Sequence, residues 1–140
     1  MKYKAPLLLL QLITSIFLYA SVPERTNWWK FDDPTDLLRA ETNYTGSLSL
    51  HGTHQSVTGP TSGNGAVMIG QGSYYTLSHL IAANGGGSFV NEYSIQVDFK
   101  VSATTSWHCF FQTDPGNTND GDLFINPSGN IGVAAVGYAN

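Results

Sequence analysis

The stretch Tyr93-Ser94-Ile95-Gln96-Val97-Asp98-Phe99-Lys100-Val101 decides the fold class. Its apolar side chains occupy every second position, and polar side chains fill the positions between them. Because successive side chains of a β-strand point to opposite faces, this alternation predicts a strand with one buried face and one wet face. No apolar stripe of helical period persists elsewhere in the sequence. We therefore expect an all-β domain.

Shorter runs on both sides of this stretch carry the same strand signal. They span residues 47–50, 66–69, 74–77, 106–112, 122–125 and 130–134. The last two are separated by Asn126-Pro127-Ser128-Gly129, whose Pro and Gly stand where a type I turn prefers them, so we expect a hairpin there. Many short strands separated by turns are typical of an antiparallel two-sheet sandwich.

The connections between these runs are rich in glycine. Residues 59–65 and 84–88 carry no bulky side chains to bury, so they are expected to be loops. Only Pro34 to Glu41 suits a short helical turn, with Asp33 or Asp32 as its N-cap.

Composition limits the class of protein further. The chain has 140 residues, which suffices for one domain with a hydrophobic core. Its net charge is −4, and only 11% of its residues are charged, so binding of nucleic acid through a basic patch is not expected.

The first twenty residues have the order of a secretory signal peptide. Lys2 and Lys4 precede an apolar stretch over residues 5–19, and the small residues Ala20 and Ser21 follow. We expect cleavage after Ala20, which makes residues 1–20 the leader and residues 21–140 an extracellular or cell-surface domain without a membrane span. An uncleaved signal anchor is the alternative, although the apolar stretch is short for one.

Cysteine usage excludes an internal disulfide, because Cys109 is the only cysteine. The alternation of the run around it predicts a small buried hydrophobe. A catalytic thiol is not expected, since the adjacent His108 would point to the opposite face of a regular strand.

Several segments together resemble the LamG-like jelly-roll domains of the concanavalin A-like lectin and glucanase superfamily. The resemblance covers residues 28–140 and is carried by the order and spacing of Trp29-Lys30-Phe31-Asp32, residues 65–70, 84–87, 90–95, 111–114, 120–126 and 129–133. It implies an antiparallel two-sheet jelly roll in a secreted or surface protein that serves as a binding or adhesion module.

The sequence departs from the family pattern at its end. Complete domains of this type continue with further strands beyond the position that matches Tyr138-Ala139-Asn140. We therefore expect a jelly roll that is incomplete at its C-terminus, with apolar faces open to water; a shortened sandwich that closes in another way is the alternative.

An enzymatic function is not expected. Glucanases on this fold resemble one another in a Glu-x-Asp-x-Glu strand, which places paired carboxylates on one face. The only glutamates here are Glu24, Glu41 and Glu92, and none has such a partner. The Asp120-Gly121-Asp122 run has a matching spacing but lies in a Gly-rich loop, and no Gly-x-Ser-x-Gly motif occurs.

An acidic loop between two of the predicted strands is a candidate calcium site. Oxygen ligands of the kind that calcium takes crowd together at Asp114, Asn117, Asn119, Asp120 and Asp122. The spacing does not fit an EF-hand, and a solvated loop of Asx turns is the alternative. His51 and His54 lie three residues apart but lack a third ligand for zinc.

Aromatic side chains offer a carbohydrate-binding surface. The candidates are Trp28, Tyr74 and Tyr75, and neighbouring aromatic residues in a strand must divide between its two faces. Trp29 shares the parity of Phe31 and is expected in the core.

The sequence therefore predicts a secreted, non-catalytic binding or adhesion module whose partner is a glycan or an extracellular protein. The alternatives are an accessory or partial domain of a glycoside hydrolase and a purely structural spacer.

Overall fold

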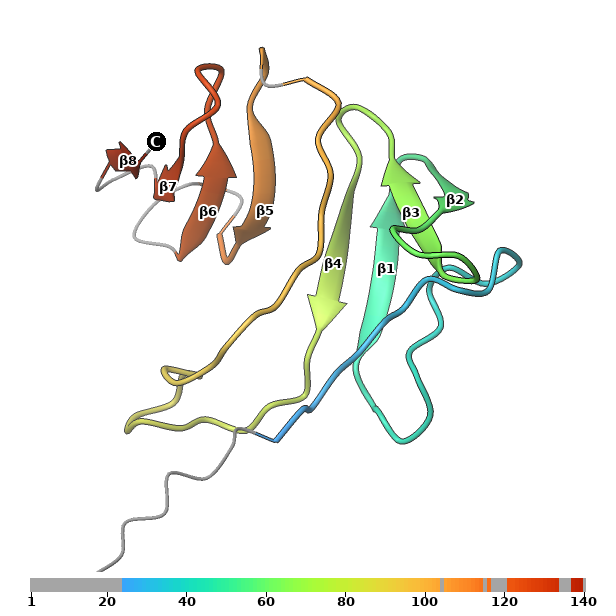
Figure 1. Ribbon diagram of the computed structural model, residues 1–140. Coiled ribbons are helices and arrows are strands. Elements are labelled where there is room, and N and C mark those ends of the chain that lie inside the picture. The colour runs from blue at the N-terminus through green and yellow to red at the C-terminus, as the bar shows by residue number, and fades with distance from the viewer. Residues whose placement is uncertain (1–23, 104, 115, 117–120, 134–136, 140) are drawn as a thin grey trace, which may run out of the picture. The chain divides into compact units, whose positions relative to one another are not determined.

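The computed structural model describes residues 24–103, 105–114, 116, 121–133 and 137–139 (Figure 1). These residues contain eight β-strands and no helix, and the strands pair antiparallel. The chain divides into two compact units, with the boundary between Glu92 and Tyr93. The predicted all-β class is therefore confirmed for the described part of the chain.

The first unit contains an interrupted antiparallel ribbon. Strand β1 (Ser47–His51) pairs with β4 (Tyr74–Ser78), and β2 (His54–Thr58) pairs with β3 (Gly65–Ile69). The β2–β3 hairpin closes through the predicted Gly-rich loop, where the N–H of Gly59 donates to the carbonyl of Asn64 at 2.8 Å. Figure 1 shows the two pairs as consecutive parts of one ribbon.

The ribbon is interrupted between its two strand pairs, where Gly52 and Thr53 on one side pack closely against residues 70–73 on the other. Gly52 has a φ of 101°, and a Cβ at this position would lie on the hydroxyl of Ser73. That hydroxyl accepts a hydrogen bond from the N–H of Thr53 at 2.9 Å, and the carbonyl of Thr53 accepts one from Gly70 at 2.9 Å. The two connections therefore lock together where the ribbon changes register.

The N-terminal segment is held to the ribbon by side chains that bond to distant backbone groups. Asn27 donates to the carbonyl of His79 at 2.9 Å and accepts from the N–H of Gly46 at 2.7 Å. The carboxylate of Asp32 accepts from the N–H of Gly65 at 2.7 Å. Each of these bonds joins residues that lie far apart in the sequence.

The helical turn predicted over Pro34 to Glu41 is wrong, because the chain forms two separate turns there. The carboxylate of Asp33 accepts from both the N–H and the hydroxyl of Thr35, and Asp36 accepts in the same way from the N–H of Leu38. These local bonds compete with helical hydrogen bonding, so the segment forms separate turns and no helix.

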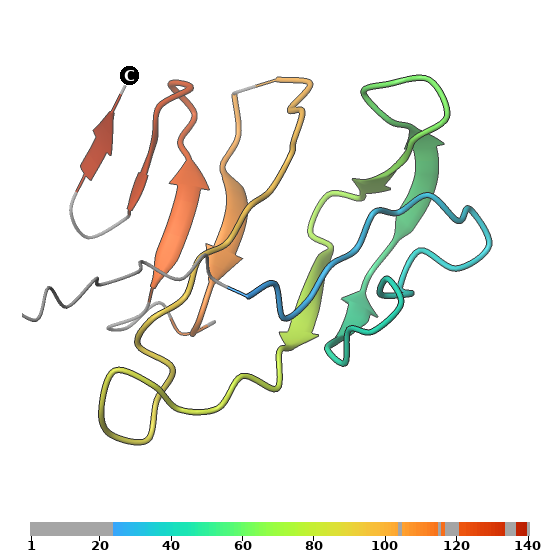
Figure 2. The same ribbon diagram turned by 60° about the horizontal axis from the view of Figure 1, so that its bottom comes forward.

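The second unit contains a four-stranded antiparallel sheet in the order β5-β6-β7-β8 (Figure 2). Its strands are β5 (His108–Gln112), β6 (Asp122–Ile125), β7 (Ile131–Val133) and β8 (Gly137–Ala139). The predicted β6–β7 hairpin is confirmed: the N–H of Gly129 donates to the carbonyl of Asn126 at 2.9 Å.

The strands predicted from the shorter runs are confirmed, with ends shifted by a residue or two, whereas β2 and β8 were not predicted. The strand predicted over Tyr93 to Val101 is wrong, since that stretch belongs to no strand ladder. The small sheets show an all-β antiparallel class and do not by themselves make a jelly-roll sandwich.

Little of the apolar surface is buried. Among the described residues, the buried hydrophobic side chains are Leu37 in the first unit and Ile125 in the second, each 6% exposed. Other large apolar side chains stay open to solvent, including Trp107, Met68 and Phe89.

The predicted leader, residues 1–20, lies outside the described residues. Within the described part, no helix is long and apolar enough to cross a membrane.

Candidate functional site

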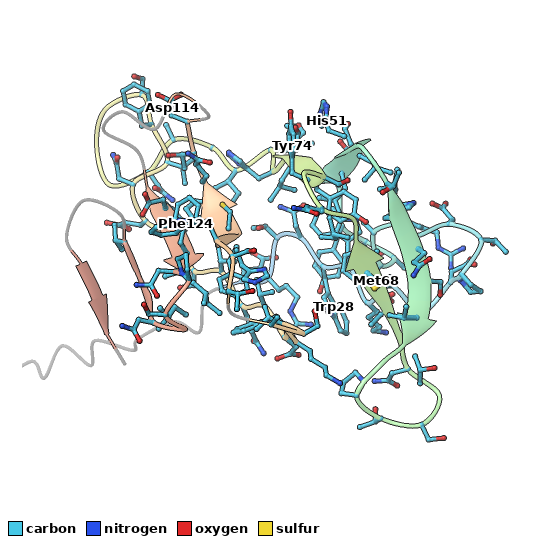
Figure 3. The ribbon with its side chains drawn as sticks, turned by 90° about the horizontal axis from the view of Figure 1, so that it is seen from above. Trp28, His51, Met68, Tyr74, Asp114 and Phe124 are labelled. Atoms are coloured by element: carbon cyan, nitrogen blue, oxygen red, sulfur yellow. The ribbon has the colours of Figure 1, made fainter. Side chains whose placement is uncertain are left out.

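An aromatic pair lies at the end of the β1–β4 ribbon, next to the tight connections. His51 and Tyr74 are opposite one another in the register, and their rings stack at 4.6 Å between centroids with only 9° between planes. Figure 3 shows the two side chains together at the end of the strands. Tyr74 keeps 57% of its surface exposed, so the ring offers a flat face to solvent beside the imidazole.

Tyr75 points to the other side of the ribbon. Its hydroxyl and Nδ1 of His54 form a 2.6 Å hydrogen bond, and its ring lies nearly parallel to that of Phe31 at 6.3 Å. Burial raises the pKa of the Tyr75 phenol above its ordinary value. The prediction that the two tyrosines divide between the faces is therefore confirmed: Tyr74 is exposed and Tyr75 is partly buried.

Two residues with polar groups neighbour Tyr74, one in the sequence and one across the strands: Ser73 and His51. Ser73 directly precedes Tyr74, and its hydroxyl is fixed by the N–H of Thr53. His51 covers one face of the Tyr74 ring, and a flat aromatic face on its other side suits a ligand that has an apolar face of its own.

Trp28 is exposed as predicted, but the structure does not bring it to the tyrosines. Figure 3 shows it away from the His51–Tyr74 pair. Arg25 and Lys30 lie over its ring at 4.2 and 4.4 Å from the centroid. Because these cations already occupy the ring, Trp28 is a poorer stacking surface than Tyr74.

Trp29 is half-buried, and its indole N–H donates to the carbonyl of Leu38 at 3.1 Å. This agrees with the predicted inward parity of Trp29 and Phe31, both of which are more buried than the residues beside them.

Of the predicted calcium ligands, only Asp114 and Asp122 are described; Asn117, Asn119 and Asp120 lie outside the described residues. The carboxylate of Asp114 accepts from the N–H of Gly116 at 2.7 Å, which is the bond of an Asx turn. Asp122 is buried at the start of β6. In the described part of the chain, no three His, Cys, Asp or Glu side chains gather around one point, so calcium stays a prediction.

The two histidines considered as zinc ligands contact different tyrosines. His51 stacks on Tyr74, and His54 bonds to Tyr75.

The prediction of a buried Cys109 is wrong, because this side chain is exposed. It lies opposite Phe124 on the face of the sheet that also carries the exposed Trp107, whose ring meets Phe124 edge-on at 6.2 Å. Alternation predicts that Trp107 and Cys109 share a face, but it does not predict whether that face is covered. In the structure this face is exposed to solvent.

Sequence reasoning missed the His51–Tyr74 stack, although a signal for it was present. The loop at residues 59–65 is the tip of the ribbon, so counting outward from it on both sides brings residue 51 opposite residue 72, close to Tyr74. The change of register between the two strand pairs moves the partner of His51 to Tyr74, and no local pattern predicts that change.

Comparison with known proteins gave no match to this chain, whether among family models, curated proteins or solved structures.

Proposed function

We propose that this protein is an exported, non-catalytic binding or adhesion module that holds carbohydrate against the exposed face of Tyr74. The proposal includes a LamG-like jelly-roll ancestry, which the resemblance of residues 28–140 supports. The antiparallel all-β class and the position of the aromatic pair at a strand end agree with such a module.

The exposed Tyr74 ring is the observation that carries the proposal. Its stacking with His51 fixes the ring plane before a ligand arrives, so binding costs little side-chain entropy. A pyranose ring presents C–H groups on its faces and hydroxyl groups around its edge. The C–H groups fit the face of the phenol ring that His51 does not cover, and the hydroxyl groups at the edge of the sugar stay open to water.

A glycan array with the purified full chain tests this proposal, with Tyr74→Ala as the decisive variant. We expect the wild type to bind a defined class of glycans, and Tyr74→Ala to bind at least about fivefold more weakly, since one aromatic contact contributes on the order of 1 kcal/mol or more.

Phe89→Ala is the matched control, because Phe89 is even more exposed, at 75%, and lies outside the site. Its variant should bind as the wild type does. Absence of glycan binding by the wild type, or equal losses in both variants, would refute the role of Tyr74.

A further inference from the structure

The stretch from Tyr93 to Val101 runs as an extended chain that carries the pattern of a strand without a strand partner. Within the described part of the chain, no residue from Ser94 to Val101 makes a hydrogen bond, and neither Asp98 nor Lys100 forms an ion pair. Its backbone N–H and C=O groups are therefore available to another strand.

The apolar side of this stretch is held in place by the sheet of the second unit. The Tyr93 ring packs on Phe111 at 5.8 Å, and the Phe99 ring packs on Phe110 at 4.2 Å. Phe110 and Phe111 both reach it because the register of β5 shifts between Cys109 and Phe111.

These contacts surround a cavity of about 390 Å³ whose lining is mostly apolar. The stretch lies along it with Tyr93, Ile95, Val97 and Phe99, which are still 48–53% exposed. Because the sheet already holds both ends of the stretch extended, little backbone freedom remains to be lost when a partner strand pairs with it.

The polar side of the stretch indicates which strand fits. Its only charges are Asp98 and Lys100, which stand two residues apart on one face. When two copies pair antiparallel about Phe99, each Asp98 lies opposite the Lys100 of the other copy, and each Val97 lies opposite a Val101. Opposite charges across a strand pair are favourable, and like charges are unfavourable.

Other registers do not match the charges. Antiparallel pairing about Val97 places Asp98 opposite Gln96 and Lys100 opposite Ser94, so both charges face neutral side chains. A parallel in-register pair places Asp98 beside Asp98 and Lys100 beside Lys100, so like charges face one another.

We propose that two copies of this protein associate by antiparallel pairing of residues Val97 to Val101 about Phe99, at the C-terminal end of the Tyr93–Val101 stretch. The association supplies each stretch with the strand partner that its own chain does not provide, and the two-fold symmetry makes one surface complementary to itself. It also brings the apolar sides of the two stretches next to one another.

Charge reversal in the full chain tests the register, with sedimentation equilibrium as the measurement. Asp98→Lys and Lys100→Asp each place like charges opposite one another twice in a homodimer. We expect each single variant to raise the dimer dissociation constant at least about tenfold.

An equimolar mixture of the two variants should restore association. At positions 98 and 100, one chain then carries two positive charges and the other carries two negative charges, so both cross-strand pairs join opposite charges. Glu92→Lys, which reverses a charge just before the stretch, should dimerise as the wild type does.

A monomeric wild type at all accessible concentrations would overturn the proposal. So would a dimer that the single variants leave unchanged, or a mixture that stays monomeric.

Discussion

The two units of this protein have four strands each among their described residues, but they are held together in different ways. In the first unit, side chains such as Asn27 and Asp32 bond to backbone groups far along the sequence. In the second unit, the contacts that reach across from the Tyr93–Val101 stretch to the sheet are aromatic, and the side chains of the stretch that make them are half open to solvent.

The difference indicates where each unit gains its structure. Hydrogen bonds are directional, so the first unit fixes a ribbon and its turns without a large core. Apolar contact is non-directional and scales with the area removed from water, so the second unit depends on how completely its apolar surface is covered. Substitutions of core residues should therefore act most strongly in the second unit.

The largest expected effect comes from Ile125→Ala. Ile125 is 6% exposed, and truncation of a buried isoleucine costs about 2–5 kcal/mol of the free energy of unfolding. Ile95→Ala is the matched control, because the same side chain is 51% exposed in the same unit and should cost less than about 1 kcal/mol.

Urea unfolding followed by circular dichroism measures both values. Equal losses in the two variants, at a protein concentration where the chain is monomeric, would mean that Ile95 is covered within one copy, and would remove the contrast between the buried and open parts of this unit.

A smaller effect is expected from Gly65→Ala in the first unit. A Cβ at Gly65 would lie 2.3 Å from the carbonyl oxygen of Phe31 and 2.9 Å from Cα of Asp32. Backbone cannot yield as a flexible side chain does, so the N-terminal segment must move and the Asp32–Gly65 hydrogen bond is weakened. We expect a loss of about 1–3 kcal/mol.

Thermal unfolding of Gly65→Ala, with Thr61→Ala from the exposed tip of the same hairpin as control, checks this value. A Gly65→Ala variant as stable as the control would show that the N-terminal segment is not held against β3.

The comparison also shows what the sequence could and could not predict. Alternation and turn residues located most of the strands, because both signals are local: the β6–β7 hairpin follows from Asn126-Pro127-Ser128-Gly129. The division of Tyr74 and Tyr75 between opposite faces follows from the same two-residue period, but the period does not decide which of the two is exposed.

Features that depend on distant partners could not be predicted in this way. The alternation of Tyr93 to Val101 defines two faces but supplies no neighbouring strand, so the stretch stays outside a ladder. Cys109 has the sequence surroundings of a core residue, yet burial requires a second layer over its face. The side chain of Asn27 donates a hydrogen bond to the carbonyl of His79, which lies 52 positions further along the sequence. No local sequence pattern predicts a contact over that distance.

The smallest expected effect concerns acid, and it acts in the hydrogen-bonded unit. The pKa of Asp33 lies below its ordinary value of 3.8, first because its carboxylate accepts the Thr35 hydroxyl and backbone N–H, and then because Arg39 is nearby. Since the folded pKa is depressed, the contribution of Asp33 to stability is present above pH 3.8 and is lost as the pH falls through the folded pKa.

Asp33→Asn removes this titration while keeping the shape of the side chain. The wild type should be slightly more stable than the variant at about pH 6, and the difference should close as the pH falls below 3.8 and through the folded pKa, because protonation then removes the same charge from Asp33. Urea unfolding of both proteins across this range measures the difference. A difference in the free energy of unfolding that stays constant down to the lowest pH would mean that the turn at Asp33 does not depend on the charge of its carboxylate. Acid would then not distinguish the first unit from the second.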